Sequence, residues 1–227
     1  MPGRVIHGAG RISELPEEAE ALGAKRIMFC CTKSRLPEVE NIATSLGERF
    51  AGICDKAKIF VPLAAVELGR EQARATEADC LVSFGGGTAV GLAKAIALEQ
   101  GQPIISIVTT YSGSETTALQ GIIGHDGVRT NYRDMRMLPR SLIYDPELTL
   151  DVPLGVSVAS GFNSISHAVS SYLGKDANPV ANMYSEHGIR TMSAALVQLA
   201  ENPRDIDARS NAMHGAWLCG MTLMSSG

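Results

Sequence analysis

Short apolar runs alternate with helix-like segments along the first half of the chain. Apolar runs at 26–32, 80–84 and 103–110, with a weaker one at 52–57, are typical of buried strands in a parallel sheet. The segments between them, at 36–46, 64–78 and 89–100, have the residue pattern of helices. This alternation predicts a parallel sheet covered by helices on both faces.

The pattern changes near residue 150, after which we find only helical segments. They cover 158–173, 179–199 and 205–225, and Asn178 and Pro179 suit the cap and first position of the second helix. We therefore predict a dinucleotide-binding α/β domain over residues 1–153 and an all-helical domain over 154–227. The last segment is still apolar helix material with no polar tail, so we expect the helical domain to be truncated.

Composition narrows the class of protein. A hydrophobic fraction of 45% in 227 residues is ample for a core, and the net charge of −4 argues against nucleic-acid binding. The apolar runs are too short to span a bilayer, and no signal peptide is visible. The five cysteines lie in apolar runs without a Cys-x-x-Cys pair, which suits reduced thiols rather than structural zinc. We expect a cytoplasmic protein with no membrane or nucleic-acid partner.

A glycine loop gives the sharpest chemical signal. Gly85, Gly86, Gly87 and Thr88 stand between a predicted buried strand and a predicted helix. Glycines let the backbone approach a ligand closely, and a helix start presents free N–H groups to an anion. A tight turn without a ligand would need fewer glycines, so we predict phosphate binding. We also expect a side chain at Gly86 to block the phosphate without disturbing the fold.

A second loop, 109–115, follows the next strand and is rich in hydroxyl groups. The carboxyl edge of an open α/β sheet is where ligands bind, and hydroxyl donors suit phosphates, ribose or an amide. Helix capping by Ser112 or Ser114 is the plainer interpretation, and it is compatible with binding. The predicted cofactor-binding residues of the two loops are Gly85, Gly86, Gly87, Thr88, Thr109, Thr110, Ser112 and Ser114.

A third motif, 161–167, contains Asn163 and His167, which share one face of a predicted helix. A carboxylate at 163 would have made a good pair of ligands for a divalent metal, but asparagine is a neutral and weaker ligand. A lone histidine on a helix is more often a hydrogen-bonded boundary residue than a catalyst. His187 and His214 have no partner motif.

Together these motifs resemble the iron-containing alcohol dehydrogenase superfamily, and within it the maleylacetate reductase branch. The matching segments, which cover most of the chain, are the glycine loop with Lys94, the hydroxyl-rich loop 109–115, 138–139 with 144–149, and 161–167. Metal-dependent members usually carry Asp where this chain has Gly91 and Asn163, and the reductase branch resembles this chain at both places. The family's two further histidine positions would lie beyond residue 227.

The resemblance implies a fold with an active site between a dinucleotide-binding and a helical domain. It also implies a homodimer. It implies transfer of hydride from NADH or NADPH to maleylacetate, a small-molecule substrate, giving 3-oxoadipate in the degradation of aromatic compounds, with no metal expected. The implied catalytic residues are His167, Tyr111 and Asn163. Because 32–35 contains no acid, we predict that Lys33, with Arg35, tolerates a 2′-phosphate.

Two alternatives remain open. One is a metal-dependent alcohol or polyol dehydrogenase of the same superfamily, which would need a metal at His167 and a ligand replacing Asn163. The other is a non-catalytic fragment that binds a nucleotide or a partner. A metal assay separates the first alternative from the reductase.

Overall fold

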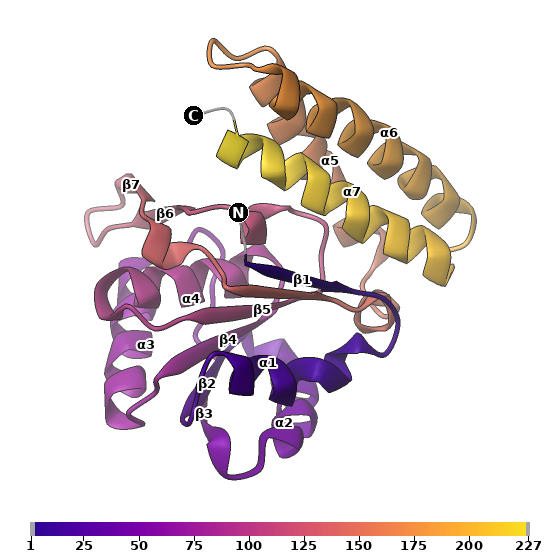
Figure 1. Ribbon diagram of the computed structural model, residues 1–227. Coiled ribbons are helices and arrows are strands. Elements are labelled where there is room, and N and C mark those ends of the chain that lie inside the picture. Colours follow the sequence, from indigo (N-terminus) through magenta and orange to yellow (C-terminus); the bar gives the residue numbers. More distant parts are fainter. Residues whose placement is uncertain (1–2, 226–227) are drawn as a thin grey trace.

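The protein, described here by a computed structural model over residues 3–225, is built on a six-stranded parallel sheet. Its strands are β1 (Arg4–His7), β2 (Ile27–Cys30), β3 (Phe50–Cys54), β4 (Cys80–Gly85), β5 (Ile104–Val108) and β8 (Ser141–Tyr144). Their order is β1-β8-β5-β4-β2-β3, and all neighbouring strands are parallel (Figure 1). The predicted parallel sheet is therefore confirmed.

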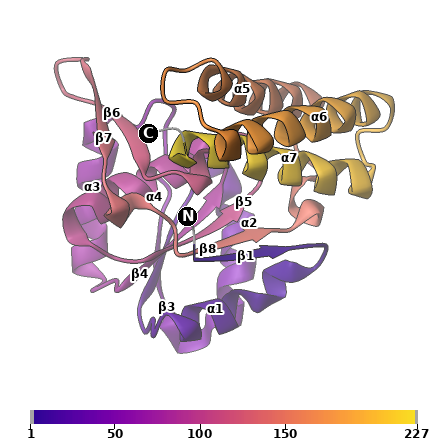
Figure 2. The same cartoon turned by 45° about the horizontal axis from the view of Figure 1, so that its top comes forward.

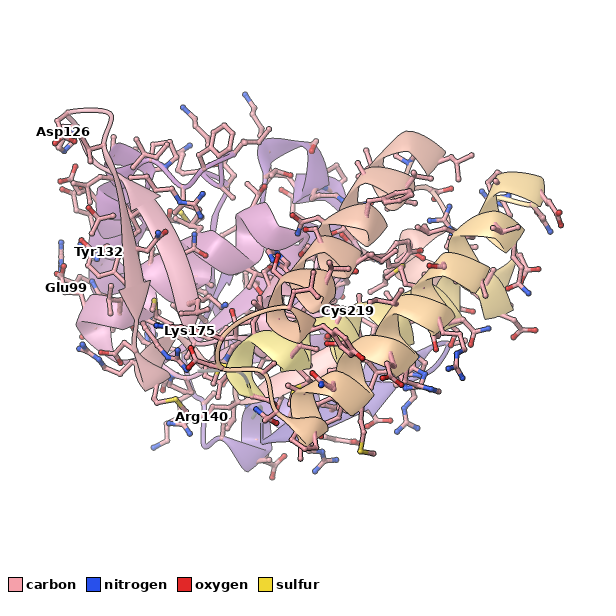
Figure 3. All side chains as sticks on the ribbon, turned by 90° about the horizontal axis from the view of Figure 1, so that it is seen from above. Glu99, Asp126, Tyr132, Arg140, Lys175 and Cys219 are labelled. Carbon is pink, nitrogen blue, oxygen red and sulfur yellow. The ribbon has the colours of Figure 1, made fainter. Side chains whose placement is uncertain are left out.

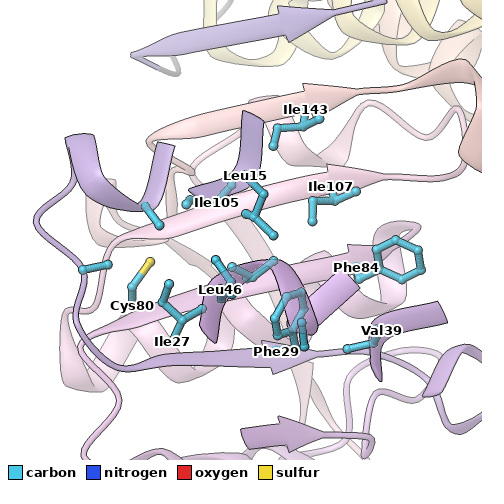
Figure 4. Packing of buried hydrophobic residues seen from close by; sticks show 14 of the residues in the cluster. Leu15, Ile27, Phe29, Val39, Leu46, Cys80, Phe84, Ile105, Ile107 and Ile143 are labelled. Carbon is cyan, nitrogen blue, oxygen red and sulfur yellow. The ribbon is translucent and has the colours of Figure 1, made fainter. Parts of the chain in front are cut away.

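Helices cover both faces of this sheet because its central strands are apolar on both sides. On β2, Phe29 packs with α1 (Leu15–Ala21) and α2 (Leu36–Ala43), whereas Met28 packs with α3 (Leu63–Ala75) and α4 (Gly87–Gln100). Alternating side chains point to opposite faces of a strand, so a continuous apolar run supplies two cores. Figure 4 shows the first core, in which Phe29, Ile105 and Ile107 contact the α1 and α2 side.

Three helices follow the sheet: α5 (Leu154–Tyr172), α6 (Pro179–Glu201) and α7 (Ile206–Ser225). A third core joins them to the sheet, where Leu142 and Tyr144 of β8 pack with Met192 of α6 and Ala212 of α7. Both ribbon views place α7 between the sheet and the other two helices (Figures 1 and 2). None of the helices in residues 3–225 is long and apolar enough to cross a membrane.

A separate antiparallel hairpin consists of β6 (Leu119–Ile123) and β7 (Arg129–Arg133). Seen from above in Figure 3, Asp126 marks its tip and Tyr132 lies along its outer strand. Short 3-10 turns link the larger elements at Arg11–Glu14, Lys33–Arg35, Thr44–Arg49, Ser114–Thr116, Met135–Met137 and Pro146–Thr149.

The predicted strands and helices all exist, within a few residues of their expected ends. Asn178 caps α6 as predicted, because its side chain accepts a hydrogen bond from the amide of Ala181 at 3.0 Å. The sequence patterns missed β1, α1, β8 and the hairpin. The outer hairpin strand β7 is exposed throughout and β1 is exposed at three of its four residues, so neither gave an apolar run. Helix α5 begins at Leu154, beside the predicted domain boundary, and the domain division itself stays a prediction.

The loop after β5 contacts helix α7 through two glycines. A Cβ atom on Gly113 would lie 2.7 Å from the carbonyl oxygen of Ala216, and one on Gly220 would lie 2.3 Å from the carbonyl oxygen of Gly113. Real Cβ contacts are never this short, so backbone meets backbone here without room for a methyl group. Gly113 also has a φ of 73°, which favours glycine.

We expect Gly220→Ala to destabilise the protein by about 1–3 kcal/mol or more, because the added methyl group forces the loop and α7 apart. This loss would outweigh the gain of up to about 1 kcal/mol that alanine normally brings to a helix interior. The matched control is Gly155→Ala in α5, where an added Cβ meets nothing within 4 Å. Urea unfolding measures both, and equal stability of the two variants would contradict the tight contact.

Candidate functional site

The strand order brings three loops together at one edge of the sheet. From β2 the chain goes outward to β3, then returns to β4 on the other side of β2 and continues to β5. In open α/β sheets this reversal leaves a crevice at the carboxyl ends of the strands, where ligands bind. The loops after β2, β4 and β5 therefore share the expected binding edge.

A cavity of about 840 Å³ lies at this edge, within the usual size range for sites of small molecules and cofactors. The loops and the start of α5 surround it. Its lining residues are Thr32, Ser34, Arg35, Ile59, Gly85, Gly86, Gly87, Thr88, Ala89, Thr109, Thr110, Ser112, Asp151, Val152, Pro153, Gly155, Val156, Ala159, Ser160 and Asn163.

The glycine loop forms the floor of this cavity at the start of α4. Gly85 ends β4 with a φ of 141°, a conformation that other residues rarely adopt, and Gly86 caps the helix. The carbonyl oxygen of Gly86 accepts from the amides of Ala89 and Val90, so these are the first bonds of the helix. The amides of Gly87 and Thr88 precede them and are oriented as in other anion-binding helix starts.

Gly86 is also a packing position, contrary to our expectation that a side chain there would leave the fold intact. A Cβ atom at Gly86 would lie 2.4 Å from Oγ1 of Thr110. Any larger residue would therefore push the loop after β5 away before it reached a ligand. Loss of binding in such a variant could not be assigned to the phosphate site alone.

The hydroxyl-rich loop supplies three cavity-lining side chains, Thr109, Thr110 and Ser112. Ser114 does not line the cavity, but its hydroxyl lies 3.1 Å from that of Ser112. A Cβ atom on Gly87 would stand 3.2 Å from the Ser114 hydroxyl oxygen, so this loop rests directly on the glycine loop. The two loops singled out by the sequence thus form one surface.

Tyr111 has a different place from the one expected of a catalytic residue. Its side chain is fully buried and packs with Tyr144 and Ala212 in the third core. Its hydroxyl donates to Oγ1 of Thr149 at 3.3 Å and accepts from Arg209 at 3.2 Å. The structure therefore assigns Tyr111 to the packing between the sheet and the helices, with its side chain outside the cavity.

Arg209 is fully buried and bridges the helical part to the segment before α5. Its guanidinium donates to Oγ of Ser157 at 3.0 Å, to the carbonyl oxygen of Val152 at 3.2 Å and to that of Pro203 at 2.7 Å. No carboxylate of residues 3–225 forms an ion pair with Arg209, so neutral oxygens hold its charge. This arrangement fixes the start of α5, which lines the cavity.

Lys94 is a second buried cation, about two turns into α4 beneath the two loops. Its Nζ donates to the carbonyl oxygens of Ser114 at 2.6 Å and Leu119 at 3.2 Å, and to Oγ1 of Thr117 at 3.0 Å. Burial lowers the pKa of Lys94 to about 7, and the charge of Glu115 opposes this shift. Lys94 therefore holds the hydroxyl-rich loop in place by bonds that need its protons.

Glu115 completes this buried network. Its Oε1 accepts a hydrogen bond of 2.6 Å from the hydroxyl of Tyr144, while its Oε2 has no partner in the described part of the chain. Burial raises the pKa of Glu115, which the Tyr144 bond and the charge of Lys94 counteract. Neither Lys94 nor Glu115 lines the cavity, so both act on it through the loop.

Asn163 and His167 share a face of α5 as predicted. Of the two, Asn163 lines the cavity and His167 does not. The Asn163 amide nitrogen lies 3.1 Å from Nε2 of His167 and can donate to it when the imidazole is neutral. Partial burial lowers the pKa of His167, which favours that neutral form. Across residues 3–225, no three His, Cys, Asp or Glu side chains gather closely enough to hold a metal ion.

Of the two cations that follow β2, Arg35 lines the cavity and Lys33 does not. Lys33 is exposed and absent from the lining, whereas the Arg35 side chain is 21% exposed, pairs with Glu38 and lies over the Phe84 ring at 5.8 Å. Sequence reasoning also missed Ile59 and Ser160. Ile59 lies in an irregular turn and Ser160 resembles any helix serine, so neither gave a signal.

Comparison with protein families identifies the relatives of this fold and site. The family model described as iron-containing alcohol dehydrogenase matches residues 2–146, and the C-terminal model of the same family matches residues 157–227. The chain belongs to the iron-containing alcohol dehydrogenase family. The family resemblance predicted from the glycine loop and the three later motifs is confirmed.

Two maleylacetate reductases are similar to this chain, one in sequence and one in structure. The maleylacetate reductase of Burkholderia cepacia is 46% identical over 220 residues, which cover 97% of this chain and 62% of that protein. The crystal structure of maleylacetate reductase from Rhizobium sp. strain MTP-10005 matches with a TM-score of 0.95 at 40% identity, covering 100% of this chain and 65% of that one.

A putative alcohol dehydrogenase from Ralstonia eutropha JMP134 is similarly close. Its structure gives a TM-score of 0.95 at 45% identity, covering 98% of this chain and 63% of the matched chain. The chain thus spans somewhat less than two thirds of the length of these relatives. The comparisons show the family and the fold of this chain.

We expect Lys94→Met to remove a rise in stability between pH 7 and pH 9. Because the folded pKa of Lys94 is about 7 and the unfolded value about 10.5, the unfolded chain holds a proton that the folded protein releases. The stability of the wild type relative to Lys94→Met should therefore increase with pH, by up to about 1.4 kcal/mol per unit.

Urea unfolding at pH 7, 8 and 9 measures this difference. Titration of the cysteines affects both proteins, so it cancels when the variant is subtracted, whereas a contribution of Glu115 stays in the difference because the charge of Lys94 counteracts the rise in its pKa. A difference independent of pH would show that Lys94 titrates alike in the folded and unfolded states.

Proposed function

We propose that the chain forms the cofactor-binding part of an NAD(P)H-dependent maleylacetate reductase, which reduces the carbon–carbon double bond of maleylacetate to give 3-oxoadipate. The observation that carries the proposal is the donor-lined cavity at the sheet edge, together with relatives named maleylacetate reductase at up to 46% identity. The expected small-molecule substrate and the nicotinamide cofactor both follow from this proposal.

The cavity suits a dinucleotide from one end to the other. The amides of Gly87 and Thr88 and the start of α4 favour the negative pyrophosphate, since a helix start carries a partial positive charge. Hydroxyl groups of Thr109, Thr110 and Ser112 offer hydrogen bonds nearby. The pyrophosphate would therefore lie over the glycine loop, with the adenosine toward β2 and the nicotinamide toward α5.

Asn163 and His167 lie at the α5 end, where the substrate would meet the nicotinamide. When bound, the cofactor supplies the hydride. The amide of Asn163 can hydrogen-bond a substrate carboxylate or orient the neutral imidazole of His167. A proton must reach the carbon that does not receive hydride, and His167 is the candidate to deliver it from its protonated form, in which Nε2 carries a hydrogen and Asn163 turns its amide oxygen to accept it. Tyr111, which we had also predicted as catalytic, has its hydroxyl in the core instead.

The metal requirement is a separate part of the proposal. Members of the iron-containing family are named for a metal, but the Asn163 and His167 pair supplies one strong ligand, and the described residues add no third side chain to it. These residues do not fit an iron site by themselves. We propose that the enzyme works without a metal, that it forms a homodimer and that it is cytoplasmic, as the family resemblance implied.

The complete gene product should oxidise NADH or NADPH only when maleylacetate is added, which absorbance at 340 nm records. His167→Ala should lower kcat by about 10²-fold or more if this residue delivers a proton. His125→Ala is the matched control, because His125 lies on the exposed hairpin and pairs with Glu67. Turnover of simple alcohols without turnover of maleylacetate would overturn the proposed substrate.

Treatment with a chelator should leave the rate with maleylacetate unchanged. Replacing a carboxylate by Asn163 removes the negative charge that a divalent cation prefers, so no bound metal is expected to support the reaction. Metal analysis of the treated protein provides the control for removal. Activity that is lost on chelation and restored by Fe²⁺ or Zn²⁺ would move the protein to the metal-dependent alcohol dehydrogenases.

Both NADH and NADPH should serve as cofactors, with Arg35 responsible for tolerating the 2′-phosphate. Arg35→Ala should raise the Kd of NADPH about tenfold or more, since a charge-assisted hydrogen bond is lost, while the Kd of NADH changes little. Lys33→Ala is the matched control, because Lys33 is exposed and outside the cavity lining. Equal losses in the two variants would contradict the assignment to Arg35.

A further inference from the structure

A turn at 58–61 exposes two large apolar side chains beside the cavity. Ile59 is 69% exposed and Phe60 is 68% exposed, yet of these two only Ile59 lines the cavity. Large apolar side chains held in water at the mouth of a pocket are typical of surfaces that a ligand covers. The turn follows β3, and an isolated bridge between Thr32 and Lys56 joins the segment before it to the loop after β2.

The backbone of this turn is strained. Phe60 and Val61 have φ angles of 65° and 50°, which non-glycine residues seldom adopt, and a β-branched residue such as Val61 least of all. Strain of this kind persists only where the surroundings determine the conformation, and it often occurs at ligand sites. The surroundings of Val61 show how it is held.

Val61 is fixed by a helix on one side and by the hairpin on the other. Its carbonyl oxygen accepts from the amide of Ile123 at 3.2 Å, and its side chain is 4% exposed. A Cβ atom on Gly91 of α4 would lie 2.7 Å from Cγ2 of Val61. The missing side chain at Gly91 therefore makes the space that Val61 fills, and Val61 anchors the end of the turn that carries Ile59.

We propose that Ile59, held over the cavity by Val61 in the space left by Gly91, is the apolar platform on which the adenine ring of the dinucleotide packs. The inference rests on the proposed function, which supplies the dinucleotide. Adenine is the planar, weakly polar end of that ligand, and its ribose lies near the loop after β2 in folds of this type. Ile59 is an apolar residue that lines the same cavity as Thr32 and Arg35 of the loop after β2.

Ile59→Ser tests the platform directly, and Phe60→Ser is the matched control. The two residues are neighbours in one turn with nearly equal exposure, but Phe60 does not line the cavity. We expect Ile59→Ser to weaken NADH binding about five- to tenfold, since the apolar area buried by the ring is lost, and Phe60→Ser to leave it unchanged. Both side chains are exposed, so the melting temperature should not move.

Ligand fragments locate the contact. ADP-ribose keeps the adenine, whereas reduced nicotinamide mononucleotide lacks it. Ile59→Ser should weaken ADP-ribose by the same factor as NADH and leave the mononucleotide unaffected. An equal loss for the mononucleotide, or an equal loss in Phe60→Ser, would overturn the proposal.

Gly91→Ala tests the positioning through Val61. It should weaken NADH binding in the wild-type background and add no further loss to Ile59→Ser, because both changes remove the same contact. Additive losses would contradict the link. If the wild-type protein and Ile59→Ser bind NADH equally well, the proposed adenine contact of Ile59 is wrong but the proposed function stands. If the wild-type protein binds no NADH, both the adenine contact and the proposed function are wrong.

Discussion

The structure depends on the close packing of the loop after β5 between the glycine loop on one side and helix α7 on the other. Residues 109–116 leave β5 and rest on the glycine loop, where Gly86 meets Thr110 and Gly87 meets Ser112 and Ser114. On its other side the same loop meets α7 at Gly220. A methyl group on any of these glycines would be forced against its neighbour. The cavity and the attachment of the helices therefore share one constraint, which is the absence of side chains at these positions.

Buried charges hold this loop and its neighbours in place at a cost. Lys94 donates to Ser114 in this loop and to Thr117 and Leu119 just beyond it, and Arg209 donates to carbonyl and hydroxyl oxygens around the start of α5. Each cation loses its hydration, and hydrogen bonds to neutral oxygens offset that loss only in part. Such groups specify a single arrangement, so the lining of the cavity is set by residues that do not touch it. These bonds fix the path of the hydroxyl-rich loop, although the loop is irregular.

The sequence pattern was most informative where one strand leads into one helix. The run 80–84 followed by three glycines predicted β4, the turn and α4, because local apolar periodicity decides all three. Contacts between distant segments had no such signal. Gly113 contacts Gly220, and Gly91 leaves space for Val61, so both contacts join residues far apart in the chain. The sequence around an isolated glycine does not show which distant residue it contacts.

Tyr111 and Lys33 show a second limit. Thr109, Thr110 and Ser112 line the cavity, whereas the side chain of Tyr111 among them packs in the third core. The chain bends at Thr110 and Tyr111, so no regular alternation in the sequence separated Tyr111 from its neighbours. Lys33 and Arg35 both follow β2, but the turn Lys33–Arg35 brings only the second to the lining. Which of the two cations reaches the cavity depends on the path of the backbone, and the residue types alone do not determine that path.

Hydrogen–deuterium exchange with and without NADH tests the central claim that the loop on the glycine turn carries the cofactor. Amides respond to a ligand that contacts them or orders their segment, independently of turnover. The account predicts that NADH protects 85–90 and 109–117 together, with added protection at 32–35. Protection confined to the groove of α5 and α6 around Tyr172 and Ile189, or no protection at 85–90, would contradict it.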